Sequence, residues 1–199
     1  MQNRISMHST ITLDNALAIP ERRALSTTMW IGTFALMTAI GAQIIIPTVP
    51  VPFTLQTFFV LLSGALLGPR KGAAAQLSYL AMGAVGLPVF AGFSGGFPFL
   101  LGPTGGYLIG FPFAAWVTGM LLYENGLLRH LPRAVSGVLA MLLGTIVIFA
   151  MGITQLNFVL LNDWNASFNA GFISLQLWDA VKIAAAAGIY AELGRRFAK

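Results

Sequence analysis

The sequence predicts an all-α integral membrane protein, a bundle of six transmembrane helices, from three observations. The 199-residue chain is 57% hydrophobic and 9% charged, with a mean hydropathy of +0.80, whereas average globular chains are about 25% charged. Several uncharged apolar runs approach or exceed the ~20 residues that a helix needs to cross a bilayer. The basic residues gather in the connections at one end of the bundle that these runs would form, as membrane topology demands.

A polar segment, residues 1–26, precedes the first expected span, and we expect it to be a cytoplasmic tail. It lacks an apolar core followed by a cleavage site, so the sequence predicts no cleaved signal peptide. The start codon could encode Met1 or Met7. The expected membrane domain covers residues 27–195, and residues 196–199 form a second cytoplasmic tail.

The first expected span, residues 27–47, carries two small residues spaced by four, Ala35 and Ala39. This spacing lets another helix approach closely, either inside the bundle or from a partner protein. The prolines of the IPTVPVPFTLQT stretch that follows prevent the helix from continuing. They predict a stiff, extended or re-entrant loop.

The second expected span, residues 54–67, is short for a full crossing, so we expect it to tilt or to begin below the membrane surface. Thr54 is a candidate N-cap for this helix, which places Gln56 in its first turn on the loop side. Gly68 and Pro69 end the span.

Four further spans are expected at residues 72–87, 107–123, 134–161 and 170–191. The fifth span of the six, residues 134–161, is long enough to tilt. The NDWNASFN stretch that follows it is polar and is expected to be a loop.

The distribution of Lys and Arg fixes the expected orientation. Apart from Lys182, every basic residue falls on the side of the termini, namely Arg4, Arg22, Arg23, Arg70, Lys71, Arg129, Arg133, Arg195, Arg196 and Lys199. None falls in the opposite connections, residues 48–53, 88–103 and 162–169. The positive-inside rule then places both termini in the cytoplasm, as in a multi-pass protein of a prokaryotic plasma membrane.

The segment from Gly86 to Gly110 is apolar and uncharged, yet its six internal glycines and three prolines make it a poor continuous helix. Irregular backbone at membrane depth is tolerated only where protein buries it or where it lines a cavity. We therefore expect this segment to be the wall or lid of a ligand cavity that opens outward.

Asp179 and Lys182 lie within the otherwise apolar last span and share a helix face at a spacing of three. Each charge near the bilayer centre costs about 2.5–3.5 kcal/mol on insertion scales. The pair is either a structural ion pair or the polar floor of a ligand site, and intramembrane charges favour the second interpretation.

Aromatic residues gather near the outer half of the expected bundle. They are Phe53, Phe90, Phe93, Phe97, Phe99, Tyr107, Trp164, Phe168 and Trp178. Trp164 and Phe168 fit an interfacial aromatic belt, whereas those in the Gly- and Pro-rich segments could form an apolar ligand wall. Trp178 could stack on a ligand or face lipid.

The sequence argues against several other classes of function. It contains no G-x-x-x-x-G-K-[ST] phosphate loop and no H-E-x-x-H motif. The two histidines, His8 and His130, fall in expected cytoplasmic segments, so no catalytic triad is credible. The net charge of +5 is explained by topology, not by nucleic-acid binding. We expect no enzyme activity, no cofactor and no metal site.

An ordered set of motifs gives a resemblance. Pro50-Val51-Pro52-x-Thr54-Leu55-Gln56-Thr57, Gly64-Ala65-Leu66-Leu67-Gly68, Gly86-Leu87-Pro88-Val89-Phe90, Gly102-Pro103-Thr104-Gly105-Gly106-Tyr107-Leu108 and Asp179-x-x-Lys182 resemble the BioY family. Its members are biotin-binding S components of energy-coupling factor (ECF) transporters. The resemblance covers about residues 27–195.

The resemblance implies a compact six-helix bundle that binds biotin from outside and docks to a membrane coupling subunit with two ATPase subunits. It implies that Ser94 in GFSGG, with Asp179 and Lys182, surrounds the fused rings of biotin, and that Ala35 and Ala39 dock to the coupling subunit. The expected substrate-binding set is Asp179, Lys182, Ser94, Gly95, Tyr107, Thr104, Phe90 and Gln56.

The residues agree with this ligand. The ureido group of biotin has two N–H donors and one carbonyl acceptor, which a buried carboxylate and ammonium satisfy. No Arg or Lys on the expected outer face is available for the biotin carboxylate, which leaves water or backbone N–H groups of the loops as its partners. A stand-alone biotin carrier and an S component for another small vitamin remain alternatives.

Overall fold

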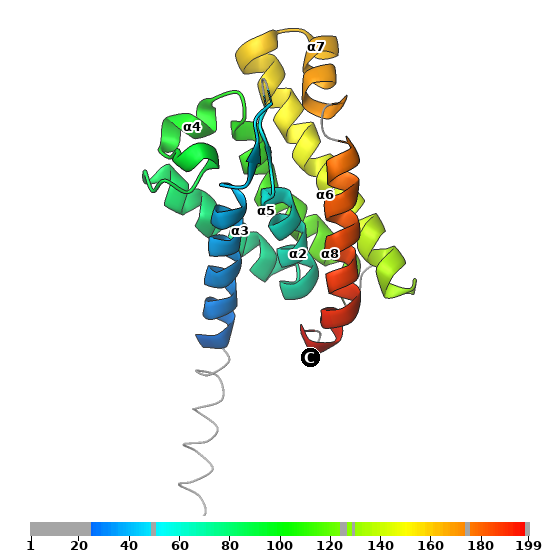
Figure 1. Ribbon diagram of the computed structural model, residues 1–199. Coiled ribbons are helices and arrows are strands. Elements are labelled where there is room, and N and C mark those ends of the chain that lie inside the picture. Colours follow the sequence, from blue (N-terminus) through cyan, green and yellow to red (C-terminus); the bar gives the residue numbers. More distant parts are fainter. Residues whose placement is uncertain (1–24, 49–50, 124–126, 129, 174–175, 198–199) are drawn as a thin grey trace, which may run out of the picture.

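The computed structural model describes residues 25–48, 51–123, 127–128, 130–173 and 176–197. These residues are largely helical, with one small antiparallel ribbon of two strands (Figure 1). The N-terminal helix, Leu25–Gly41, stands at one side of the bundle and is drawn in blue. Residues 1–24, which hold most of the expected N-terminal tail, lie outside the described residues, as do Arg129 and Lys199.

The helices after the N-terminal one follow the order of the expected spans. They are α2 (Gln56–Leu67), α3 (Pro69–Ala84), the short α4 (Phe97–Leu101), α5 (Gly105–Leu122), α6 (Arg133–Leu156), the short α7 (Trp164–Phe168) and α8 (Gln176–Phe197). A 3₁₀ turn, Ala91–Phe93, precedes α4. Two π-helical turns, Asn157–Leu161 and Asn169–Ile173, flank α7.

Helix α5 is the centre of the bundle, because it packs against α2, α3 and α6, while α8 closes the other side against α2 and α6. Glycines allow the close approach of α2 and α3. A Cβ atom at Gly72 would lie 2.8 Å from the Cα atom of Gly64, and one at Gly64 would lie 2.9 Å from the carbonyl carbon of Ala115 in α5. Small residues at helix contacts are the usual device for packing helices in membranes.

The first helix is shorter than the expected span of residues 27–47. The N-terminal helix ends at Gly41, not at residue 47, because β1 (Ile45–Ile46) pairs with β2 (Phe53–Thr54). Ile45 lies opposite Thr54, and Ile46 lies opposite Phe53. The helical expectation was therefore wrong for Ile45 and Ile46, which with Phe53 and Thr54 form a β-hairpin that the expected extended loop did not foresee.

Two other expected boundaries differ for local reasons. Helix α3 begins at Pro69, not at residue 72, because proline fits the first turn of a helix, where its missing N–H is not needed. Gly68 makes this tight junction at a φ of 84°. The expected polar loop contains α7, whose N-cap carboxylate, Asp163, accepts from the N–H groups of Asn165 (2.8 Å) and Ala166 (3.2 Å).

Ala35 is buried in the hydrophobic core at 2% exposure, and Ala39 packs half-buried against that core. Of the two alternatives for this pair, the structure therefore supports packing inside the bundle. Docking of Ala35 and Ala39 to a coupling subunit stays a prediction.

By length and composition, two helical segments of the described residues are apolar enough to cross a membrane alone, Gly105–Leu122 and Arg133–Leu161. The N-terminal helix and α2 are also apolar but shorter.

Candidate functional site

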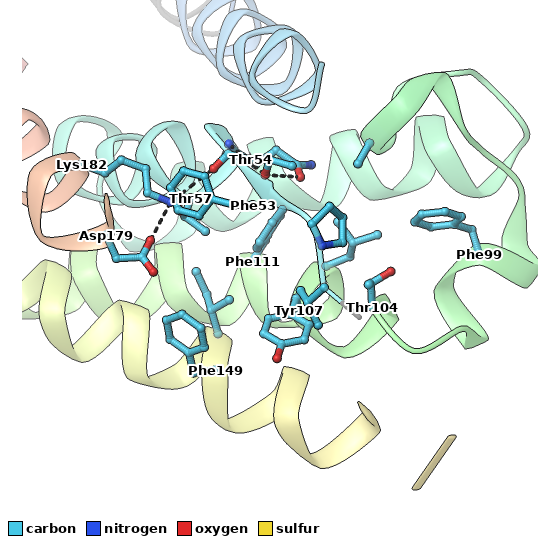
Figure 2. A pocket seen from close by; sticks show the side chains of 16 residues that line it. Phe53, Thr54, Thr57, Phe99, Thr104, Tyr107, Phe111, Phe149, Asp179 and Lys182 are labelled. Atoms are coloured by element: carbon cyan, nitrogen blue, oxygen red, sulfur yellow. Dashed lines mark hydrogen bonds and ion pairs between the residues drawn. The ribbon is translucent and has the colours of Figure 1, made fainter. Parts of the chain in front are cut away.

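A cavity lies where the hairpin, the start of α2, the α4–α5 segment, α6 and α8 meet (Figure 2). Its lining is predominantly apolar and consists of Val51, Pro52, Phe53, Thr54, Gln56, Thr57, Ala91, Phe99, Thr104, Tyr107, Leu108, Phe111, Ile148, Phe149, Asp179 and Lys182. An apolar cleft with a few convergent polar groups is the usual form of a small-molecule site.

Asp179 and Lys182 project from one face of α8 into this cavity. The Lys182 ammonium lies 2.6 Å from a carboxylate oxygen of Asp179. Each residue is only 7% exposed. The expectation that the two share a face is confirmed, and the pair forms the charged end of the cavity (Figure 2).

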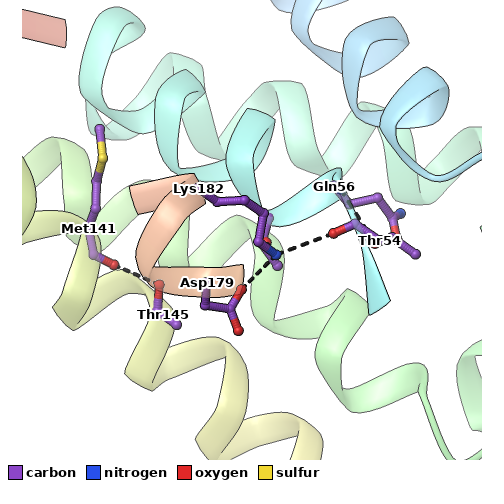
Figure 3. A network of polar contacts seen from close by, with 7 residues as sticks. Thr54, Gln56, Met141, Thr145, Asp179 and Lys182 are labelled. Atoms are coloured by element: carbon purple, nitrogen blue, oxygen red, sulfur yellow. Dashed lines mark hydrogen bonds and ion pairs between the residues drawn. The ribbon is translucent and has the colours of Figure 1, made fainter. Parts of the chain in front are cut away.

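The Lys182 ammonium has a further partner on the hairpin (Figure 3) and another on α2 (Figure 2). It donates to the backbone carbonyl of Thr54 at 3.3 Å and to the hydroxyl of Thr57. With Asp179, these two acceptors account for all three N–H donors of a lysine. A ligand acceptor must therefore replace one of them.

A chain of buried hydrogen bonds runs from the hairpin to the Gly/Pro-rich wall. The Thr54 hydroxyl donates to Oε1 of Gln56 at 2.9 Å. Nε2 of Gln56 donates to the Tyr79 hydroxyl, which in turn donates to the Val89 carbonyl at 3.2 Å. Gln56 lines the cavity. These hydrogen bonds therefore fix the orientation of the Gln56 side-chain amide relative to the backbone at Val89.

The segment between α3 and α5 contributes to the cavity wall, as its composition predicted. Ala91, Phe99 and Thr104 line the cavity from this segment, and Tyr107 follows in the first turn of α5. The Gln43 side chain holds the segment from outside. Its amide nitrogen donates to the Phe90 carbonyl at 3.1 Å, and its oxygen accepts from the Phe93 N–H at 2.9 Å.

The structure brings five of the eight expected substrate-binding residues to the cavity. They are Gln56, Thr104, Tyr107, Asp179 and Lys182. The hydroxyl of Tyr107 is buried and has no hydrogen-bond partner among the residues that the structure describes. The Tyr107 ring packs edge-on against Phe149 at a centroid distance of 6.0 Å.

Phe90, Ser94 and Gly95 stand behind the wall and do not line the cavity. Phe90 is fully buried and stacks on Phe99 at a centroid distance of 5.3 Å. The Ser94 hydroxyl donates to the Ala91 carbonyl at 2.6 Å. Gly95 packs against the backbone of Leu87, where an added Cβ would lie 3.0 Å from the carbonyl carbon.

Sequence reasoning missed several residues of the lining. Phe111 lies one turn after Tyr107 on α5, and that spacing could have identified it. Thr57 lies in the first turn of α2, directly after Gln56, and no helix-face spacing links it to Thr54, which belongs to β2. Ile148 and Phe149 come from the middle of an apolar helix, where no local pattern distinguishes them.

Comparison with known sequences decides the family. The model of the BioY family matches residues 9–199. The chain belongs to the BioY family. Among its relatives is the biotin transporter BioY of Thermotoga maritima, 43% identical over 157 residues that cover 78% of this chain and 88% of that protein. A probable biotin transporter BioY from Pyrococcus horikoshii matches with the same identity and coverage.

A solved structure supports the same fold for this BioY-family chain. It is the crystal structure of the S component for biotin from an ECF-type ABC transporter, with a TM-score of 0.80 at 24% identity. The match covers 89% of this chain and 98% of that one. The protein thus has the fold of an ECF S component, and its named relatives are membrane transport proteins rather than enzymes.

Proposed function

We propose that this protein is the biotin-binding S component of an ECF-type uptake transporter. The observation that carries the proposal is the buried Asp179–Lys182 pair, 2.6 Å apart, at one end of an apolar cavity. The Asp179 carboxylate accepts hydrogen bonds from the ureido N–H groups, and Lys182 donates to the ureido carbonyl. The names of the relatives support the same ligand.

The apolar remainder of the cavity suits the other parts of biotin. Phe111, Phe149 and Ile148 offer surface to the thiophane ring and the acyl chain. Gln56 and Thr104 also line the cavity and supply neutral hydrogen-bonding groups. A site that hydrogen-bonds its ligand with buried polar groups rejects analogues that lack those groups, so this arrangement favours the ureido ring over other small vitamins.

In this proposal the six helices of ten or more residues among the described residues cross the membrane, both termini lie in the cytoplasm and the cavity opens outward. The distribution of Lys and Arg along the sequence supports this orientation. Membrane-coupling and ATPase partners supply the energy, since the sequence contains no phosphate-binding loop of its own.

Calorimetric titration of the purified full-length protein with biotin tests the proposal. We expect binding in the nanomolar range, about −12 kcal/mol. A folded protein that does not bind biotin would contradict it. Uptake of labelled biotin by cells that lack other biotin transporters, with and without a coupling module, then separates an S component from a stand-alone carrier.

A further inference from the structure

We infer that the pocket offers no positively charged partner to the carboxylate of the ligand's acyl tail. Biotin amides are therefore ligands of this protein, as biotin itself is. In these amides the tail carboxylate is replaced by a neutral carboxamide. The inference rests on the proposed function, and it defines the substrate class that the same site accepts.

The charges of the lining are concentrated at one end. Asp179 and Lys182 are the charged members of the lining that the structure describes. They are bound to each other, and the other two ammonium donors are used by Thr54 and Thr57. The pair has no net charge to offer to a distant carboxylate.

The opposite side of the cavity is neutral. Figure 2 shows Phe99 and Thr104 on the side away from Asp179 and Lys182. Ala91 also belongs to the Gly/Pro-rich wall. The only polar side chain that these three residues offer is the hydroxyl of Thr104, which can bond an acid or an amide equally well.

Within the part of the chain that the structure describes, no basic residue besides Lys182 lines the cavity. In the sequence, residues 45–57 and 86–110, from which the hairpin strands and the wall come, contain no charged residue. Asp163 lies in the connection after α6, where its carboxylate caps α7. It has the same sign as a ligand carboxylate and cannot attract it.

A carboxylate buried among these groups would be costly, because a buried charge needs a partner. The ligand carboxylate therefore ends beside Thr104, which is half-buried, and keeps its contact with water there. Replacing this carboxylate by a neutral amide therefore removes no ion pair. The protein therefore discriminates only weakly between biotin and its amide, whereas it discriminates strongly among ligands that differ in the ureido ring.

Competition calorimetry with biotin and biotinamide on the wild-type protein tests the inference. We expect biotinamide to bind less than tenfold more weakly than biotin. A loss of tenfold or more with biotinamide, beside tight binding of biotin, would overturn the inference and leave the proposed function intact. A folded protein that binds neither compound would contradict the proposed function itself.

A pair of variants tests where the tail ends. Thr104→Lys adds a cation at the neutral side, and Thr104→Met adds similar bulk without charge. We expect the preference for biotin over biotinamide to be at least fivefold greater in Thr104→Lys than in Thr104→Met. An equal preference in the two variants would overturn the placement of the tail beside Thr104.

Discussion

The ammonium of Lys182 lies 4.0 Å from the centre of the Phe53 ring. This contact joins the last helix to the hairpin, and the Phe53 ring also lies 6.4 Å from that of Trp178. A cation over an aromatic face gains about 0.5–2 kcal/mol, the upper value applying to desolvated sites. Phe53 thus covers the charged end of the cavity and limits the access of water to it.

Replacing Phe53 should weaken ligand binding. Phe53→Leu keeps an apolar side chain but removes the ring over Lys182, so we expect biotin to dissociate faster and bind about three- to tenfold more weakly. Stopped-flow kinetics would measure this change. Phe113→Leu is the control, since Phe113 is 52% exposed on α5 and does not line the cavity. Equal dissociation rates for the wild type and Phe53→Leu would contradict a covering role.

Removing the Tyr79 hydroxyl should destabilise the protein. Tyr79→Phe leaves the Gln56 amide and the Val89 carbonyl without their partner in a buried place, at a cost of about 1–3 kcal/mol. Thermal unfolding in detergent without ligand would measure this cost. The double variant Gln56→Leu/Tyr79→Phe should lose less stability than the sum of the two single variants. If the losses of stability in the two single variants add up to the loss in the double variant, the two side chains are not energetically coupled, and the prediction is wrong.

A methyl group at Gly64 should be poorly tolerated. Its Cβ atom would lie 2.9 Å from the carbonyl carbon of Ala115, so Gly64→Ala forces α2 away from α5. We expect a clear fall in the midpoint of thermal unfolding. Gly188→Ala is the matched control, because its added Cβ would meet no atom within 4 Å apart from the neighbouring backbone of its own helix. Alanine also favours the helix there by up to about 1 kcal/mol. A similar loss in both variants would argue against the close α2–α5 contact.

The sequence predicted the helices and the charged end of the site because both leave local signals. The apolar runs have the length of helices, and the spacing of Asp179 and Lys182 alone places them on one face. The Gly- and Pro-rich wall was also predictable, since its composition is incompatible with a long helix. The fold of the related S component agrees with these elements.

Other features depend on contacts between distant segments, which no local pattern contains. The hairpin forms because Ile45 and Ile46 meet Phe53 and Thr54; the prolines between them indicated only an extended loop. The use of Thr57 as a partner of Lys182 joins residues 125 positions apart. Phe90 looked like a wall residue by composition, yet it is buried behind Phe99.

The central claim is that Asp179 binds the ligand rather than only neutralising Lys182. Titration of biotin into Asp179→Asn tests it most directly, because asparagine keeps the shape of aspartate but removes its charge. The control is Asp163→Asn, which changes an acid outside the cavity and keeps a good N-cap residue. We predict that Asp179→Asn weakens binding at least tenfold, about 1.4 kcal/mol, while Asp163→Asn leaves it unchanged. Wild-type affinity in a folded Asp179→Asn protein would contradict the claim and reduce the pair to a structural ion pair.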